Sequence, residues 1–234
     1  MFPIGDENAG TIIKPIVNWS LIGICVAVFV YQVSLAPRQL DAFFMQYGAI
    51  PAEITDLRNL PSILTSMFLH GGFGHLFGNM VFLLVFGDNI EDAMGHVSYL
   101  LFYLLSGIAA ALTQILLNPD SQIPIIGASG AISGVMGAYI VLFPHGKIRT
   151  IVFYTVMLVP AWIMIGVWFA LQLFSGFSTL GGPDVGGVAF WAHVGGFVAG
   201  AVLVWIFKDG DAVARQNAVR EHHRSWQRAS MRSR

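Results

Sequence analysis

Six apolar stretches, separated by shorter polar ones, account for most of this chain. A continuous apolar run of about 20 residues is long enough to cross the ~30 Å hydrocarbon core of a membrane as a helix. The pattern therefore predicts an all-α membrane protein whose six spanning helices form one bundle. The expected ranges are 15–35, 62–86, 97–117, 125–142, 150–174 and 188–207.

The fourth stretch, 125–142, is the shortest, and small residues recur in it at intervals of four. Ser129 and Ser133 form one such pair, and Gly130 and Gly134 form another. Residues four apart lie on one face of a helix, and small side chains allow neighbouring helices to approach closely. We therefore expect a short central helix whose N-terminus, near Ser129, is recessed below the membrane surface.

The rest of the pattern suggests a short N-terminal segment (1–14), a membrane domain (15–207) and a basic tail (208–234). Within the membrane domain, connection 36–61 mixes charged and apolar residues, which predicts an ordered loop with short amphipathic pieces at the interface. The glycine-rich connection 176–187 is interpreted as a lid over a site. In the fifth apolar stretch, Pro160 predicts a kink.

Composition narrows the class of protein further. The chain is 56% hydrophobic and only 11% charged, whereas an ordinary soluble domain has about 25% charged residues. A chain of this kind is an integral membrane protein, and its first partner is the lipid bilayer. The net charge of −1 gives no indication of nucleic-acid binding. The single cysteine, Cys25, excludes a disulfide within the chain.

The distribution of lysine and arginine predicts the orientation. If both termini are cytoplasmic, all 12 basic residues except Arg38 and Arg58 lie on the cytoplasmic side, as the positive-inside rule requires. The N-terminal segment has no basic stretch before its first apolar run and is interpreted as a cytoplasmic leader. We expect a multi-pass protein of a bacterial inner membrane. Four tail arginines spaced four apart would line one face of a helix: Arg220, Arg224, Arg228 and Arg232. We interpret this face as solvated, with contact to anionic lipid as the alternative.

Four uncharged polar side chains fall at a similar depth in three of the apolar stretches. His75 and Asn79 lie in the second stretch, and Ser129 and His193 lie early in the fourth and the sixth. These three stretches would all run from the outside to the inside, so their early residues share the outer half of the bilayer. Polar groups in hydrocarbon are costly unless they face protein or a wet cavity. One shared cavity would accommodate all four.

Two glycines provide a way to bring the sixth stretch against the fourth. Gly196 and Gly200 lie three and seven residues after His193, on the same helical face. Close packing of this face on the small-residue face of the fourth stretch would bring His193 toward Ser129.

The residue types suggest acyl transfer by a serine nucleophile. His193 would act as the base for Ser129, and His75 and Asn79 would donate hydrogen bonds to an oxyanion. No aspartate or glutamate is expected within a span, so the arrangement would be a dyad. The alternative is that these residues are purely structural. Ser129 would then only allow close helix packing, and His75 and Asn79 would only form hydrogen bonds to neighbouring helices. His70, nearer the surface, is interpreted as a packing or loop residue.

Several short motifs occur together and in order. They are Phe68-Leu69-His70 followed by His75 and Asn79, Glu91-Asp92 with Gly95, Gly127-Ala128-Ser129-Gly130, and Ala192-His193 followed by Gly196 and Gly200. Between roughly Thr65 and Gly200 the sequence resembles the rhomboid intramembrane serine proteases. It departs from some members at Ser133, where they have a tyrosine beside the histidine ring, and at Pro61-Ser62, where many have a Trp-Arg pair.

The resemblance implies a six-helix bundle with Ser129 as nucleophile, His193 as general base, and His75 and Asn79 at the oxyanion. It implies membrane-anchored protein substrates, cut in or near their transmembrane segments after entering beside the fifth helix, and neither a metal nor an organic cofactor. The alternative is a catalytically inactive rhomboid-like chaperone or adaptor that binds transmembrane helices. A small transporter is disfavoured because no inverted repeat is visible. The oligomeric state is left open.

Overall fold

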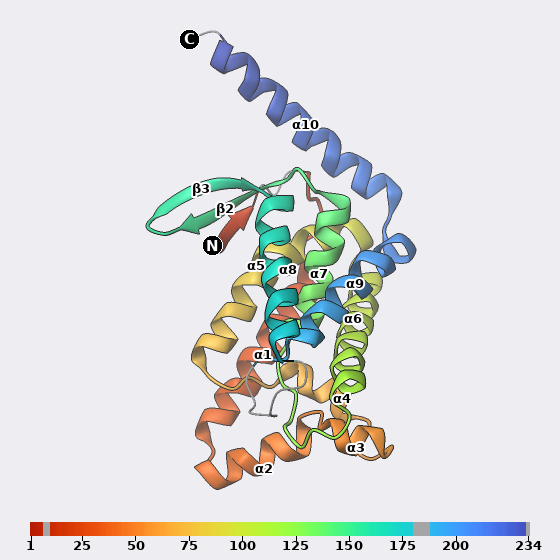
Figure 1. The fold of residues 1–234 in the computed structure, drawn as a ribbon. Helices are drawn as coiled ribbons and strands as arrows, with labels where there is room; N and C mark the ends of the chain where they lie inside the picture. Colours follow the sequence, from red (N-terminus) through yellow and green to blue (C-terminus); the bar gives the residue numbers. More distant parts are fainter. Residues whose placement is uncertain (7–9, 180–187, 233–234) are drawn as a thin grey trace.

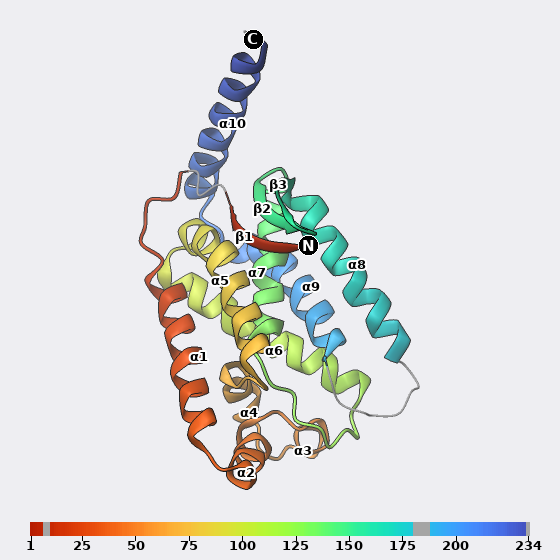
Figure 2. The ribbon, with the colours of Figure 1, turned by 90° about the vertical axis from the view of Figure 1, so that its left-hand side faces the viewer.

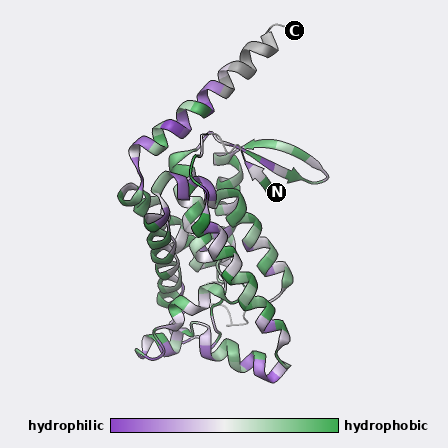
Figure 3. Cartoon of the chain, turned by 180° about the vertical axis from the view of Figure 1, so that it is seen from behind, coloured by the Kyte–Doolittle hydropathy of each residue, from purple (hydrophilic) through white to green (hydrophobic). Residues whose placement is uncertain are grey.

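The computed structural model describes residues 1–6, 10–179 and 188–232 as a mainly helical bundle with a small sheet at one end (Figure 1). Within these residues, five helices are long and apolar enough to cross a membrane. They are α1 (Ile16–Ser34), α5 (Phe73–Met94), α6 (His96–Leu117), α8 (Ala161–Thr179) and α9 (Phe190–Phe207). Figure 3 shows hydrophobic residues along these helices, whereas polar residues concentrate in the coloured first part of α10 (Gly210–Arg232) and at the two ends of the bundle.

The sixth apolar helix, α7 (Ser129–Leu142), lies in the middle of the bundle and is buried along most of its length. Its 14 residues extend only about 21 Å at 1.5 Å per residue. A helix that is apolar on all sides is typical of the interior of a bundle. Here α5, α6 and α9 surround it (Figure 2).

The connection between α1 and α5 is ordered, as the mixture of charged and apolar residues predicted. It contains α2 (Pro37–Tyr47), α3 (Pro51–Thr55), α4 (Ser62–Thr65) and a 3₁₀ turn, η1 (Ser66–Phe68). These elements lie at the end of the bundle opposite α10 (Figure 1). A short bridge between Ala49 and Ile125 joins the connection to the segment that precedes α7.

The predicted boundaries of the second stretch are wrong. The expected span began at residue 62, but α5 begins at Phe73, after Gly71 and Gly72, and continues through the expected polar turn to Met94. One of its acidic residues, Glu91, is tolerated there because it binds the start of the first span. Glu91 accepts hydrogen bonds from the backbone N–H groups of Val17 and Asn18, at 3.0 and 2.7 Å. A carboxylate is stabilised at a helix N-terminus.

The predicted fifth span is also wrong in its first part. Residues expected to open a helix instead form a hairpin of β2 (Lys147–Val152) and β3 (Thr155–Pro160), and α8 begins only at Ala161. The segment is rich in β-branched and aromatic residues, which favour strands over helices. Pro160 therefore ends a strand and does not kink a helix.

The N-terminal residues, expected to be a simple leader, form a third strand. β1 (Phe2–Asp6) pairs antiparallel with β2, with Phe2 opposite Ile151 and Asp6 opposite Ile148. The strand lies beside α5, and the Phe2 ring stacks on Phe77 of that helix with centroids 6.0 Å apart, whereas β3 leads directly into α8. The sheet therefore joins the N-terminus to two helices of the bundle.

The prediction that the tail arginines are solvated is wrong for Arg220, the first of the four that are spaced four apart. Arg220 of α10 is 0% exposed, and its guanidinium contacts the Asn89 side chain and the Tyr139 hydroxyl, the latter at 3.3 Å. Asp6 accepts hydrogen bonds from the same Tyr139 hydroxyl at 2.8 Å and from Asn89 at 2.9 Å. This cluster ties both terminal segments to α5 and α7. The side chains of Arg224, Arg228 and Arg232 lie outside the described part of the structure.

The buried Asp6 carboxyl gives this cluster a pH dependence. Burial, followed by repulsion from Asp88, raises the pKa of Asp6 from 3.8 to about 7, although Tyr139, Arg220 and Asn89 oppose the shift. A raised carboxyl pKa favours the docked strand below pH ~4, and that contribution is lost as the pH rises through 7. We expect the amides of β1 to be better protected from hydrogen exchange at pH 5 than at pH 8, after correction for intrinsic rates. Asp6→Asn should remove the difference, and equal protection of the unsubstituted strand at both pH values would contradict it.

Candidate active site

Close contact between α7 and α9 builds the site, as the spacing of small residues predicted. A Cβ atom added to Gly196 would lie 2.1 Å from the carbonyl oxygen of Gly130, and one added to Gly200 would lie 2.1 Å from that of Gly134. These distances are far shorter than any real Cβ contact, so only glycine permits the approach. The two helix backbones are therefore in direct contact, and the start of α9 lies beside the start of α7.

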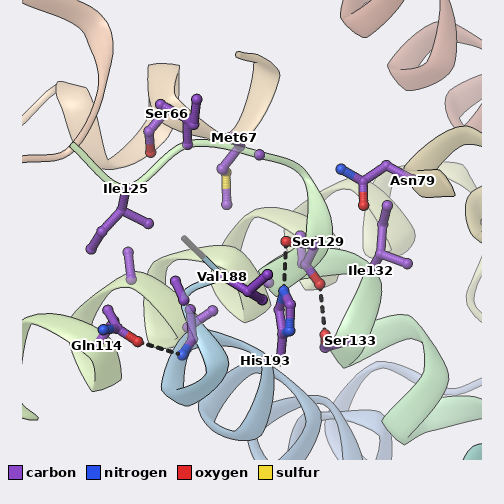
Figure 4. Close-up of a pocket in the computed structure, with 18 of the residues that line it drawn as sticks. Ser66, Met67, Asn79, Gln114, Ile125, Ser129, Ile132, Ser133, Val188 and His193 are labelled. Carbon is purple, nitrogen blue, oxygen red and sulfur yellow. Dashed lines mark hydrogen bonds between the residues drawn. The ribbon is translucent and has the colours of Figure 1, made fainter. Parts of the chain in front are cut away.

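This packing brings two of the predicted site residues into contact. Nε2 of His193 lies 2.8 Å from Oγ of Ser129, a normal hydrogen-bond distance (Figure 4). Ser129 is the first residue of α7, where unsatisfied backbone N–H groups and the helix dipole favour negative charge. The start of α9 is held in place by α6, because the backbone N–H of Ala192 donates to Oε1 of Gln114 at 3.2 Å.

The ring of His193 is held by α8 and not by the residue one turn after Ser129. Nδ1 of His193 lies 2.7 Å from Oε1 of Gln172. The ring of Trp168 lies against the imidazole, with centroids 5.9 Å apart and planes tilted by 39°. Ser133 instead donates its hydroxyl hydrogen to the carbonyl oxygen of Ser129 at 2.6 Å (Figure 4). The support that a tyrosine gives in some rhomboid proteases comes here from another helix.

His75 is oriented so that one ring nitrogen faces the start of α7. The backbone N–H of Gly71 donates to Nδ1 of His75 at 3.4 Å, which leaves the proton on Nε2. This nitrogen lies 2.7 Å from the position that a Cβ of Gly127 would occupy, and Oγ of Ser129 lies 3.6 Å from the same position. Gly127 has φ +121°, which also favours glycine. The His75 N–H therefore points toward the space beside the Ser129 hydroxyl.

Asn79, one turn further along α5, is 8% exposed and faces the same space (Figure 4). Among the described residues, its Nδ2 has no hydrogen-bond partner. A buried amide N–H without a partner costs about 1–3 kcal/mol, so its retention calls for a reason. An oxygen that becomes negatively charged during a reaction would supply one.

These side chains line a cavity of about 810 Å³ that reaches from α5 to α9. Its walls include apolar residues of the segments just before α7 and just before α9, such as Ile125 and Val188 (Figure 4). A mainly apolar cavity with a few convergent polar groups is typical of a ligand-binding or active site. The sequence-predicted residues Ser129, His193, His75 and Asn79 all line it.

His70 stays outside the reacting groups and has a packing role. It is 1% exposed, and its backbone is held by the Gln32 side chain of α1, which donates to its carbonyl oxygen at 2.8 Å and accepts from its N–H at 3.1 Å. Its ring lies 5.2 Å from the ring of His75, edge to face. His70 therefore helps to fix His75.

Sequence reasoning missed Gln172 and Gln114. Both are single amides within apolar helices, and a polar side chain in such a position requires a partner. The sequence therefore indicates that each glutamine has a hydrogen-bond partner. It does not identify that partner, which in each case is about 20 or more positions away. The glycine-rich lid predicted at 176–187 falls largely on residues 180–187, which lie outside the described residues.

The fold and the site together define a class of protein. Its members are helical bundles embedded in a membrane, with a serine and a histidine in hydrogen-bond contact at a cavity. The model of the Rhomboid domain matches residues 58–209, and the chain belongs to the rhomboid family. It is 31% identical over 205 residues to Rhomboid protein 1, mitochondrial, of Saccharomyces cerevisiae, covering 85% of this chain and 55% of that protein.

Two further relatives come from other compartments and organisms. The chain is 29% identical over 183 residues to Rhomboid-like protein 11, chloroplastic, of Arabidopsis thaliana, covering 76% of this chain and 64% of that protein. It is 32% identical over 142 residues to Rhomboid protease GluP of Bacillus subtilis, covering 60% of this chain and 25% of that protein. The chain thus spans 55% and 64% of the lengths of the first two relatives, less than two thirds of each. Two of these names are those of mitochondrial and chloroplastic proteins, so the predicted bacterial inner membrane is not supported; the apolar helices support an integral membrane protein.

Proposed function

We propose that this chain is an intramembrane serine endopeptidase that cuts membrane-anchored proteins in or near their transmembrane segments. The observation that carries the proposal is the 2.8 Å contact between Oγ of Ser129 and Nε2 of His193 at the wall of the cavity. Membership of the rhomboid family, which includes a relative named as a protease, supports it. In this proposal α7 is the short fourth of six crossing helices, and both termini face the cytoplasm.

The proposed reaction begins when Oγ of Ser129 attacks the carbonyl carbon of the scissile peptide bond. The hydroxyl proton moves to Nε2 of His193, and the carbonyl oxygen becomes an oxyanion. Breaking of the C–N bond follows, with the proton on Nε2 passing to the leaving amine. A water molecule, deprotonated by the same nitrogen, then hydrolyses the acyl-serine. His193 thus serves in turn as base and acid, in a dyad without a carboxylate.

The oxyanion would be stabilised by fixed donors around the start of α7. Nδ2 of Asn79 and Nε2 of His75 supply N–H groups from α5, and the backbone at Ser129 adds the helix N-terminus. Such donors act strongly in a site with little water. The open backbone at Gly127 leaves room for the substrate carbonyl.

A fluorophosphonate probe tests the nucleophile directly. In detergent-solubilised protein we expect labelling at Ser129, identified by mass spectrometry, and loss of labelling in Ser129→Ala. Ser133→Ala is the matched control, because this second serine of α7 lies one turn away and bonds a backbone carbonyl; it should still label. Labelling that persists in Ser129→Ala would mean that another residue is the nucleophile, and the proposal would be abandoned. Binding of membrane clients without any cleavage would favour an inactive chaperone or adaptor instead.

Removal of the Asn79 amide tests the oxyanion assignment separately. We expect Asn79→Ala to lower kcat for a membrane-embedded substrate by about 10²-fold or more, as loss of one oxyanion donor does elsewhere. Thermal stability equal to that of the wild type should show that the protein remains folded. An unchanged kcat in a folded Asn79→Ala variant would remove this role while leaving the dyad intact.

A further inference from the structure

The second ring nitrogen of His193 has its own partner, from a helix that contributes no reacting group. Oε1 of Gln172 lies 2.7 Å from Nδ1. We infer that Gln172 is a positioning residue that fixes the tautomer and the orientation of His193, an inference that rests on the proposed function. Gln172 would act through the histidine and would not touch the substrate.

The chemistry of the amide oxygen carries this inference. A carbonyl oxygen only accepts hydrogen bonds, so Nδ1 must carry the hydrogen that it donates to Gln172. In neutral imidazole the other nitrogen is then unprotonated. Nε2 is therefore free to accept the proton of the Ser129 hydroxyl, which it contacts at 2.8 Å. The opposite tautomer would present an N–H to the serine and could not serve as its base.

Proton movement leaves Gln172 chemically unchanged. When the serine proton reaches Nε2, the imidazole becomes an imidazolium, and its Nδ1–H continues to donate to the same amide oxygen. The hydrogen bond then has a charged donor, which makes it stronger than in the resting state. Gln172 thereby stabilises the charged form that follows proton transfer, without giving or taking a proton itself.

An amide suits this position better than a carboxylate because α8 is an apolar helix of spanning length. An ionised carboxylate within hydrocarbon is costly, whereas a neutral amide provides an acceptor without a charge. The interaction is weaker than that of a carboxylate, so a part of the orientation must come from packing. Trp168, one turn before Gln172, supplies it by lying against the imidazole ring.

The position of α8 is itself fixed by contacts with α9 and at the start of the helix. The ring of Phe169 stacks on Phe197 of α9, with centroids 4.2 Å apart. At the start of the helix, the backbone N–H groups of Ala161 and Trp162 donate to the carbonyl oxygens of Gly146 and Pro144 at 2.8 and 3.0 Å. Gln172 is therefore presented to His193 by a helix that is anchored before and beside it.

Kinetics of three variants test the inference. Gln172→Met keeps the length of the side chain and removes the acceptor; we expect kcat to fall about 10- to 100-fold, part of the 10²–10⁴ that a positioned general base contributes, with KM unchanged. Gln172→Glu restores an acceptor oxygen and should recover most of the loss. Leu171→Ala, at the neighbouring and 57% exposed position of α8, is the matched control and should match the wild type.

A spectroscopic readout separates positioning from a merely structural effect. In protein labelled with ¹⁵N-histidine, the two ring nitrogens of His193 should report a hydrogen on Nδ1 in the wild type, and Gln172→Met should shift the population toward the Nε2–H form. If wild-type cleavage does not depend on Ser129, the proposed function itself fails. If cleavage depends on Ser129 but Gln172→Met retains wild-type kcat and tautomer, the inference about Gln172 is wrong.

Discussion

Substitution of His193 by alanine is expected to lower the rate of substrate cleavage by about 10⁴-fold or more, because it removes both the base and the acid of the proposed reaction. The hydroxyl of Ser129 would lose the partner that lies 2.8 Å away and would remain a weak nucleophile. The rate is best measured in proteoliposomes with a membrane-anchored reporter. Fluorophosphonate labelling of the variant should fall in parallel.

A second histidine provides the matched control for this substitution. His145 is exposed and lies in the connection between α7 and β2, at the other end of α7 from Ser129. His145→Ala should therefore cleave the reporter at the wild-type rate. If His193→Ala retained substantial cleavage in a folded protein, the base would have to be another group, and the dyad would be abandoned.

The contact behind this expectation could be predicted from the sequence because two local rules agree. Glycines at intervals of four predicted a close helix pair, and a lone histidine and serine in apolar stretches predicted polar side chains that need partners. Gly196 and Gly200 do meet the α7 backbone, and His193 does reach Ser129. Spacing along a helix is a local property, so one sequence is enough to reveal it.

The boundaries of the elements could not be predicted in the same way. Hydropathy counts apolar residues without distinguishing a strand from a helix, so the hairpin of β2 and β3 was merged with α8. Acidic residues near the end of α5 were read as a turn, although the N-terminus of α1 satisfies Glu91. The second error arises because a distant segment supplies the hydrogen bonds.

Partners that are distant in sequence explain the remaining misses. Arg220 is buried because distant residues, among them Asn89 of α5 and Tyr139 of α7, provide its contacts. Gln172 faces His193 because α8 packs beside α9. Neither pairing leaves a mark in the spacing of nearby residues, so the functional meaning of these side chains emerges only from the folded chain.

Enlarging Gly200 should damage stability and activity together. In Gly200→Ala, the new Cβ would lie 2.1 Å from the carbonyl oxygen and 2.4 Å from the Cα of Gly134. Backbone atoms on both sides leave no flexible side chain to move, so α7 and α9 must separate. We expect a loss of about 3 kcal/mol or more of unfolding free energy, at the upper end for overpacked sites. Gly200→Val should be worse. The effect is measured by monitoring unfolding of the detergent-solubilised protein as the temperature is raised.

Separation of the two helices would also increase the distance between Ser129 and His193, which meet at the N-terminal ends of α7 and α9. Proton transfer requires hydrogen-bond distance, so we expect reporter cleavage to fall by at least 10²-fold even in the fraction that remains folded. Gly166→Ala is the matched control. This glycine lies within α8 with nothing within 4 Å of an added Cβ, so alanine there should be neutral or slightly stabilising. Wild-type stability and cleavage in Gly200→Ala would mean that α7 and α9 are not in backbone contact, and the route by which His193 reaches Ser129 would have to be sought elsewhere.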